Sequence, residues 1–132
     1  MRTPPFNLHL PTTISEAVQL SAEIRAEGRE TDWVAGGNDL LPNYKWQLNA
    51  KGDVISLARI EEMTTVSMTE IGAMARLSEI ADGGKAHPLV ADAARKVASS
   101  LIRNSATLGG NICLDTRCFW FNQGEDLSRI QN

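Results

Sequence analysis

A helix start lying between two short β-prone segments is the feature of this sequence that most constrains its fold. Residues 6–10 are expected to form a strand ending at Pro11, and residues 32–35 a second strand running into Gly36-Gly37. Between them, Thr13-Ile14-Ser15-Glu16 fits the capping box, which satisfies two free N–H groups at a helix start. Apolar residues then recur at helical spacing before the expected stop at Gly28: Ile14, Ala17, Val18 and Ile24. This strand–helix–strand order predicts an α/β or α+β domain.

The next residues extend this pattern. Residues 41–48 predict one or two helical turns, and residues 54–57 a third strand. The turn at residues 49–53 is the expected subdomain boundary. The predicted fold is therefore α+β overall, with a small N-terminal α/β subdomain (residues 1–52) and an incomplete second α+β subdomain (residues 53–132).

Within the second subdomain, the pattern predicts short strands over residues 64–68 and 70–73 and a helix over residues 76–82, stopped by Gly83-Gly84. Pro88 opens a clearer helix. We expect that helix to bury one apolar face: Val90, Ala93, Ala94, Val97 and Leu101. The C-terminal residues contain no pattern that closes a second core, so we expect the chain to be an N-terminal fragment.

Composition excludes several classes of function. The chain has 132 residues, of which 42% are hydrophobic and 22% charged, so we expect a folded domain and not a disordered chain. Its net charge is −3, with no basic stripe, which argues against a nucleic-acid partner. No apolar run approaches the roughly 20 residues needed to span a bilayer, and residues 1–10 lack the apolar core of a signal peptide. We therefore expect a cytoplasmic protein without a membrane partner.

Two segments place a glycine pair and an asparagine after a short apolar or β-prone stretch. They are residues 33–38 (Trp-Val-Ala-Gly-Gly-Asn) and residues 106–111 (Ala-Thr-Leu-Gly-Gly-Asn). Successive N–H groups in such a loop can converge on an anion, and asparagine adds an amide donor. From spacing alone, two tight turns are the alternative. The dinucleotide G-x-G-x-x-G and the P-loop motif are both absent, which argues against a Rossmann or Walker-type site.

Longer motifs around both glycine pairs resemble the FAD-binding flavoproteins of the xanthine dehydrogenase and carbon monoxide dehydrogenase family. Residues 34–42 (Val-Ala-Gly-Gly-Asn-Asp-Leu-Leu-Pro) are similar to the first FAD loop of that family, A-G-G-T-D-L-L-P, with Asn38 in place of the common Thr. Residues 102–111 (Ile-Arg-Asn-Ser-Ala-Thr-Leu-Gly-Gly-Asn) are similar to its second loop, I-R-N-x-A-T-[IL]-G-G-N. The resemblance covers about residues 5 to 125.

This resemblance implies a PCMH-type FAD-binding fold with FAD as the cofactor. It implies that one set of residues lies against the FAD pyrophosphate and ribityl chain: Val34, Ala35, Gly36, Gly37, Asn38, Asp39, Leu40, Leu41, Thr107, Gly109, Gly110 and Asn111. The family's usual acidic residue nine positions after Asn111 is replaced by Trp120, which departs from the pattern on the flavin side. No residue is assigned as a catalytic acid, base or nucleophile.

Residues 113–123 resemble the 4-hydroxybenzoyl-CoA reductase branch of the family. The motif Cys113-Leu114-Asp115-Thr116-Arg117-Cys118, followed by aromatic residues and Asn122-Gln123, is typical of that branch, whose flavoprotein subunit carries a [4Fe–4S] cluster. The resemblance implies that Cys118 is a cluster ligand. A cubane cluster normally needs four thiolates and this chain has two, so the cluster is expected only in a full-length subunit. From spacing alone, buried inert cysteines are the alternative.

Several single residues outside the glycine and cysteine pairs also have expected roles. His9 and His87 are isolated, so structural roles are expected for both. Asp39 is expected to cap the following helix or to order the loop. Arg103 and Arg117 either offset phosphate charge or form ordinary surface contacts. Core packing is expected for the tryptophans: Trp33, Trp46 and Trp120.

The resemblance implies an electron-transfer role in a multi-subunit oxidoreductase. The expected partners are a subunit that holds a molybdenum cofactor and a subunit that holds a [2Fe–2S] cluster. In the 4-hydroxybenzoyl-CoA reductase branch, electrons flow towards an aromatic thioester. The alternative from another class is a non-catalytic remnant or interaction module that retains the fold without tight FAD binding.

Overall fold

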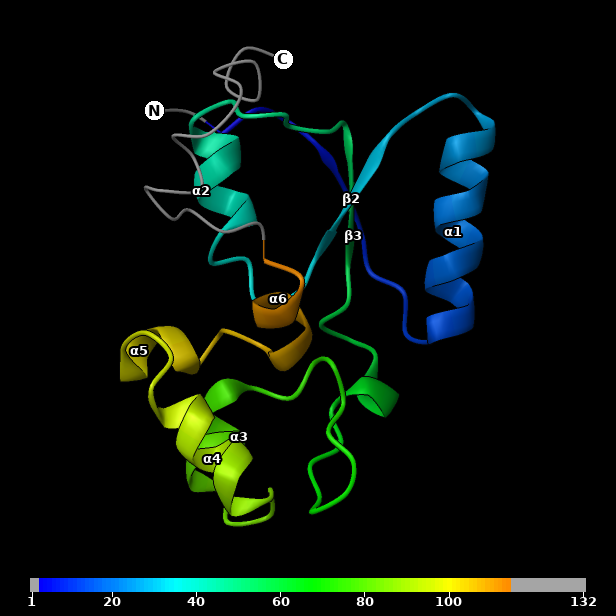
Figure 1. Ribbon diagram of the computed structural model, residues 1–132. Helices are drawn as coiled ribbons and strands as arrows, with labels where there is room; N and C mark the ends of the chain where they lie inside the picture. The colour runs from blue at the N-terminus through cyan, green and yellow to red at the C-terminus, as the bar shows by residue number, and fades with distance from the viewer. Residues whose placement is uncertain (1–2, 115–132) are drawn as a thin grey trace, which may run out of the picture.

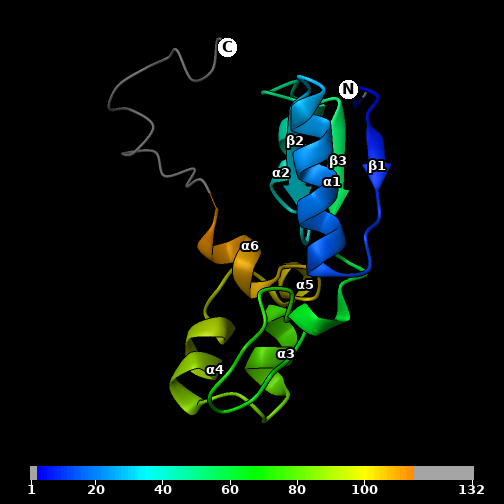
Figure 2. The same cartoon turned by 90° about the vertical axis from the view of Figure 1, so that its right-hand side faces the viewer.

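A three-stranded parallel sheet with helices on both faces forms one end of the molecule. The computed structural model describes residues 3–114. Its first elements are β1 (Asn7–His9), α1 (Ile14–Ala26), β2 (Thr31–Val34), α2 (Leu40–Lys45) and β3 (Asp53–Ser56). The strand order is β1-β3-β2, and both pairs are parallel. Figures 1 and 2 show α1 on one face of this sheet and α2 on the other. The predicted α/β character of the N-terminal region is confirmed.

Local sequence signals explain where α1 begins and ends. The Thr13 hydroxyl accepts a hydrogen bond from the Glu16 N–H at 3.1 Å, which is the first half of the predicted capping box. The Glu16 carboxylate instead accepts from the Thr12 N–H, at 2.7 Å, so the second half of the box lies one residue earlier than predicted. Gly28 follows the helix with a φ of +74°, a left-handed conformation that glycine adopts without strain.

The opposite end of the molecule is helical. It contains a 3-10 turn, η1 (Glu61–Met63), followed by α3 (Leu77–Asp82), α4 (Pro88–Arg95), α5 (Ser100–Arg103) and α6 (Leu108–Ile112). The predicted helix over residues 76–82 is confirmed. No helix within residues 3–114 has the length and apolar character needed to cross a bilayer.

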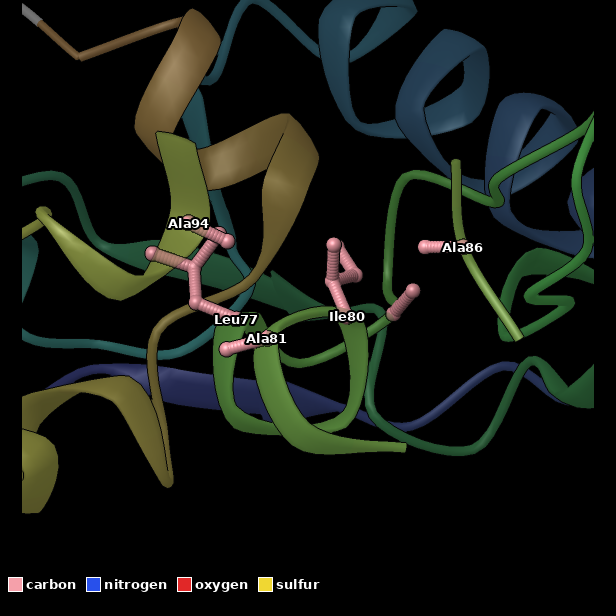
Figure 3. Packing of buried hydrophobic residues seen from close by; sticks show 6 residues of the cluster. Leu77, Ile80, Ala81, Ala86 and Ala94 are labelled. Atoms are coloured by element: carbon pink, nitrogen blue, oxygen red, sulfur yellow. The ribbon is translucent and has the colours of Figure 1, made fainter. Parts of the chain in front are cut away.

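The molecule has two separate apolar cores. The first joins α1 to β3 and η1 through Ala17, Ile24, Ile55 and Ile60, with Met63 packed against it. The second lies between α3 and α4 and is built on small residues, which let the two helices approach closely (Figure 3). It contains Ala75, Leu77, Ile80, Ala81, Ala86 and Ala94, with Val66 among the partly buried residues around it.

The sheet order and the two cores favour a different subdomain boundary from the one expected between residues 52 and 53. That boundary would separate β3 from both of its partner strands, because β3 is the central strand of the sheet. All four residues of β3 are buried, as expected for a strand covered on both faces. We therefore propose that the boundary lies between Met63, which packs on the first core, and Val66, which packs on the second.

Two predicted elements of the second region are wrong. The strands expected over residues 64–68 and 70–73 form a single antiparallel bridge, Val66 to Ile71. A tight turn joins them, with the Ser67 N–H donating to the Glu70 carbonyl at 2.8 Å. No third strand extends the pair within the described residues. The helix that Pro88 opens also ends early, at Arg95.

That early end has a local cause. Ala98 adopts a left-handed φ of +48°, which interrupts the helix, and the Ser99 hydroxyl then caps a new helix by accepting from the Ile102 N–H at 3.3 Å. Leu101, expected on the buried face, is 79% exposed as a result.

The buried carboxylate of Asp53 lies at the amino end of the sheet. The segment with the first glycine pair follows β2 and lies at the carboxyl end. The Asp53 side chain, at the start of β3, is 3% exposed and contacts Arg29 and His9, the latter at 2.8 Å. The guanidinium of Arg29, with further hydrogen bonds from His9 and Asn7, lowers the pKa of Asp53 to about 2, against the smaller opposing effect of burial. The expected structural role of His9 is thus confirmed.

Tyr44 anchors α2 to the sheet. Its hydroxyl donates to Asp32 Oδ2 at 2.8 Å and accepts from the Lys51 N–H at 3.1 Å, and its ring meets Phe6 edge-on. Burial, together with the Asp32 carboxylate, raises the pKa of Tyr44 to about 12, although the Lys51 N–H opposes this shift. This packing holds in place the helix that follows the first glycine pair.

Candidate functional site

A cleft of about 500 Å³ lies where the two ends of the molecule meet. Its first wall is the segment that leaves the carboxyl end of β2 and enters α2, and its second wall is the segment that enters α6. Ligands of open parallel sheets commonly bind beyond the carboxyl ends of the strands. The two Gly-Gly-Asn segments, far apart in sequence, therefore face one cleft. The cleft volume falls within the range typical of small-molecule sites.

Its lining contains most of the residues expected from the glycine motifs. Those are Ala35, Gly36, Gly37, Asn38, Asp39, Leu40, Thr107, Gly110 and Asn111. Val34, Leu41 and Gly109 do not line it. Residues outside the set expected to contact FAD also line it: Trp33, Asn43, Val97, Ala98, Ile102, Ala106, Cys113 and Leu114.

The first glycine pair combines close packing with an unusual backbone. A β-carbon at Gly36 would overlap the carbonyl group of Ser105, so this glycine lets the two walls touch. Gly37 has a φ of +73°, which side-chain-bearing residues rarely adopt. Within residues 3–114, the N–H groups of Gly36 and Gly37 donate to no carbonyl or side chain. They are available as donors to a ligand.

The second glycine pair lies inside the one-turn helix α6 and not in an open loop. The Thr107 hydroxyl accepts from the Gly110 N–H at 3.2 Å and so caps this helix. A β-carbon at Gly109 would lie 2.8 Å from the β-carbon of Ala73, so Gly109 serves packing between segments. A β-carbon at Gly110 would meet Thr107 Oγ1 at 3.0 Å, on the cleft side.

Two charged residues near the cleft, Asp39 and Arg103, each have two alternative roles from the sequence. Asp39 occupies the N-cap position of α2, but its side chain makes no capping hydrogen bond, so the expected capping role is wrong. Arg103 donates from Nη1 to the Val97 and Ala98 carbonyls, at 3.0 and 3.2 Å. It therefore supports a wall of the cleft. Within the described residues the lining contains neither lysine nor arginine, so the donors for an anion are backbone N–H groups and neutral side chains such as that of Asn111.

The structure also tests the roles expected for the histidines, tryptophans and cysteines. His87 accepts from the Leu89 N–H at 3.3 Å and caps α4, which confirms a structural role. Trp33 and Trp46 are 40% and 56% exposed, so core packing is wrong for both. Cys113 is exposed and unpaired with another cysteine. Arg117, Cys118 and Trp120 lie outside the described residues. Within residues 3–114 no cluster of three or more His, Cys, Asp or Glu side chains fits a metal ion.

Comparison with known proteins agrees with this geometry. Residues 4–118 match the family described as the FAD binding domain in molybdopterin dehydrogenase. The chain is 32% identical over 119 residues to the carbon monoxide dehydrogenase medium chain of Hydrogenophaga pseudoflava, an alignment that covers 85% of this chain and 40% of the relative. The chain thus spans about 40% of that relative's length.

Solved structures show the same fold. The carbon monoxide dehydrogenase from H. pseudoflava that lacks the Mo-pyranopterin moiety matches with a TM-score of 0.73 and 28% identity, over 85% of this chain and 40% of the other. Quinoline 2-oxidoreductase from Pseudomonas putida 86 matches with a TM-score of 0.71 and 25% identity, over 83% and 40%. These relatives are oxidoreductases, and they bear out the predicted fold class. The chain therefore belongs to the family of FAD-binding domains of molybdopterin dehydrogenases.

Proposed function

We propose that this chain binds the pyrophosphate of FAD in the cleft between the two Gly-Gly-Asn segments. One observation carries the proposal. These two segments lie about 70 residues apart in the sequence and form opposite walls of one cleft. The N–H groups of Gly36 and Gly37, which have no acceptor within residues 3–114, supply donors of the kind that bind phosphate oxygens. The bound flavin would carry electrons, while the protein orients it and sets its electrostatic environment.

The site residues proposed for FAD are those that line the cleft. Ala35 to Leu40 form the first wall, and Thr107, Gly110 and Asn111 the second. Val34, Leu41 and Gly109 enter this proposal as residues that support the walls. Asp39 and Cys113 are the titratable side chains among the described lining residues, and neither is assigned a catalytic role here. The proposed role is cofactor binding and electron transfer.

At the level of the complex, we propose an electron-transfer subunit of a molybdenum hydroxylase or reductase. Partner subunits would hold the molybdenum cofactor and a [2Fe–2S] cluster. Support comes from the relatives, one of which is named a medium chain and another a dehydrogenase complex subunit. Residues 113–123 favour the 4-hydroxybenzoyl-CoA reductase branch, with Cys118 as a [4Fe–4S] ligand in a longer subunit.

The experiment is an equilibrium titration of the FAD-free chain with FAD, followed by flavin fluorescence. Saturable binding supports the proposal, and its absence favours an interaction module without a cofactor. Gly37→Ala and Gly28→Ala form a matched pair, because both glycines have a φ near +74° and Gly28 does not line the cleft. Both substitutions strain the backbone by about 1–2 kcal/mol. Only Gly37→Ala should weaken FAD binding, and equal affinities in the two variants would count against this site.

A further inference from the structure

We infer that Asn38 and Ser105 together are positioning residues that hold the two walls of the cleft at the separation FAD requires. The inference rests on the proposed function and assigns the Asn38 side chain to a link between the walls. The link uses one amide proton and the carbonyl oxygen of this side chain, whereas the sequence motif suggested that the amide donates to the cofactor. The backbone N–H groups of the same wall remain the proposed phosphate donors.

The side-chain contacts of Asn38 all run to the opposite wall. Its Nδ2 donates to the Ile102 carbonyl at 3.4 Å, across 64 residues of sequence. Its Oδ1 accepts from the Ser105 hydroxyl at 3.0 Å, across 67 residues. The Ser105 hydroxyl also lies 3.3 Å from the Ile102 carbonyl, so its single proton is shared between two acceptors on opposite walls. Both polar atoms of the Asn38 side chain are thus engaged.

A backbone contact at Gly36 explains why the Asn38–Ser105 hydrogen bond determines the distance between the two walls. Gly36 packs against the backbone of Ser105 and Ala106, so the walls already touch two residues before Asn38. The contact at Gly36 limits how closely the walls approach, and the Asn38–Ser105 hydrogen bond limits how far they open. Threonine, the family's common residue at position 38, has a shorter side chain with a single hydroxyl in place of the separate donor and acceptor atoms of the asparagine amide.

Exposure sets the size of the expected effect. Asn38 and Ser105 are both exposed, so water competes for their hydrogen bonds. A hydrogen bond of this kind contributes about 0.5–1.5 kcal/mol, which converts to a change of about twofold to twelvefold in a dissociation constant. The link therefore tunes affinity and is not expected to decide whether the chain folds.

The test is a double-mutant cycle on the dissociation constant for FAD, measured with the whole chain well below its melting temperature. The variants are Asn38→Ala, Ser105→Ala and the double variant, together with Asn38→Thr. Each single substitution should raise the dissociation constant about threefold to tenfold. The double variant should be no weaker than the weaker single variant, because both changes remove one link. Ser105→Thr, which retains a hydroxyl, should restore affinity.

The control is Ser67→Ala, which removes another serine hydroxyl that holds a tight turn, through the Glu70 backbone, but does not line the cleft. It should leave FAD affinity unchanged. If Asn38→Ala weakens binding while Ser105→Ala does not, Asn38 contacts FAD directly and the inference is wrong. It is equally wrong if the variants lower only the melting temperature of the FAD-free chain. Failure of the unsubstituted chain to bind FAD overturns the proposed function and this inference together.

Discussion

Gly36 packs directly on the carbonyl group of Ser105, so that one wall of the cleft touches the other at a residue without a side chain. This contact fixes where the two Gly-Gly-Asn segments meet. It separates the roles of the two glycines in the first pair, because Gly36 serves wall packing and Gly37 serves the left-handed turn. The two positions therefore respond differently to substitution.

Gly36→Ala should destabilise the fold. The new β-carbon would overlap the Ser105 carbonyl, and backbone cannot move aside as a flexible side chain can. We expect a loss of about 1–3 kcal/mol in the free energy of unfolding, measured by urea titration. Gly52→Ala is the matched control, because a β-carbon there has no neighbour within 4 Å. A Gly36→Ala variant as stable as the control would contradict the observed contact.

Gly110→Val should weaken FAD binding. A β-carbon at position 110 lies on the cleft side, 3.0 Å from Thr107 Oγ1 and 3.6 Å from the Ala35 β-carbon, so a branched side chain would occupy ligand space. We expect at least a tenfold rise in the dissociation constant, about 1.4 kcal/mol. The flavin titration measures it, and a circular dichroism spectrum checks that α6 persists. Unchanged affinity would remove this wall from the proposed site.

Trp33 should report on FAD directly. The indole is 40% exposed and lines the cleft, so a bound flavin dinucleotide would lie beside it and quench its fluorescence. FAD should therefore quench the tryptophan emission of the unsubstituted chain and of Trp46→Phe. In Trp33→Phe most of that quenching should be lost. Trp46 is the suitable control because it is 56% exposed and does not line the cleft. Equal quenching in both variants would place the ligand elsewhere.

Asp53 should make stability depend on acid pH. The Arg29 guanidinium and His9 hold its folded pKa at about 2, below the ordinary value of 3.8, so protonation favours the unfolded chain. The contribution is complete above about pH 4 and is lost as the pH falls towards about 2. Asp53→Asn should be less stable at neutral pH and should flatten the stability profile in this interval. Urea titrations at several pH values measure it, and an equally steep profile in the variant would refute the assignment.

Cys118 is tested in a longer subunit expressed with its partners. If it is a cluster ligand, Cys118→Ser should lose iron and the visible absorbance of the cluster while keeping FAD. Cys113→Ser should have a smaller effect, since the resemblance assigns the ligand role to Cys118 and Cys113 lies exposed at the end of α6. Iron analysis and flavin content measure both. A full complement of iron in Cys118→Ser would contradict the ligand assignment.

Local signals predicted much of this fold. The threonine cap of α1, the glycine stop at Gly28 and the approximate positions of the strands and α3 follow from short-range chemistry that each segment carries by itself. The family motifs indicated both walls of the cleft. Sequence reasoning also expected those motifs to be equivalent loops, whereas the second pair lies inside α6.

Other features depend on contacts between distant segments. The part of the cleft wall formed by Val97 and Ala98 carries no motif, since it depends on the left-handed turn at Ala98 and on the hydrogen bonds that Arg103 donates to two carbonyls. The Asn38–Ser105 hydrogen bond joins residues 67 positions apart, which no local pattern encodes. That the N–H groups of Gly36 and Gly37 have no acceptor within residues 3–114 likewise becomes evident only from the folded loop.

The strand order also has a consequence for biosynthesis. β1 and β2 each pair with β3 and not with one another, yet β3 is the last of the three to be made. During translation, residues 7–34 can form α1 but no strand pair of this sheet. The backbone N–H and C=O groups of β1 and β2 therefore stay unpaired until β3 is available. Emergence of residues 53–56 completes both pairs at once and covers Ile55 with α1. A nascent chain in which only residues up to 52 have emerged from the ribosome should therefore be far more open to proteases than one in which residues up to 63 have emerged.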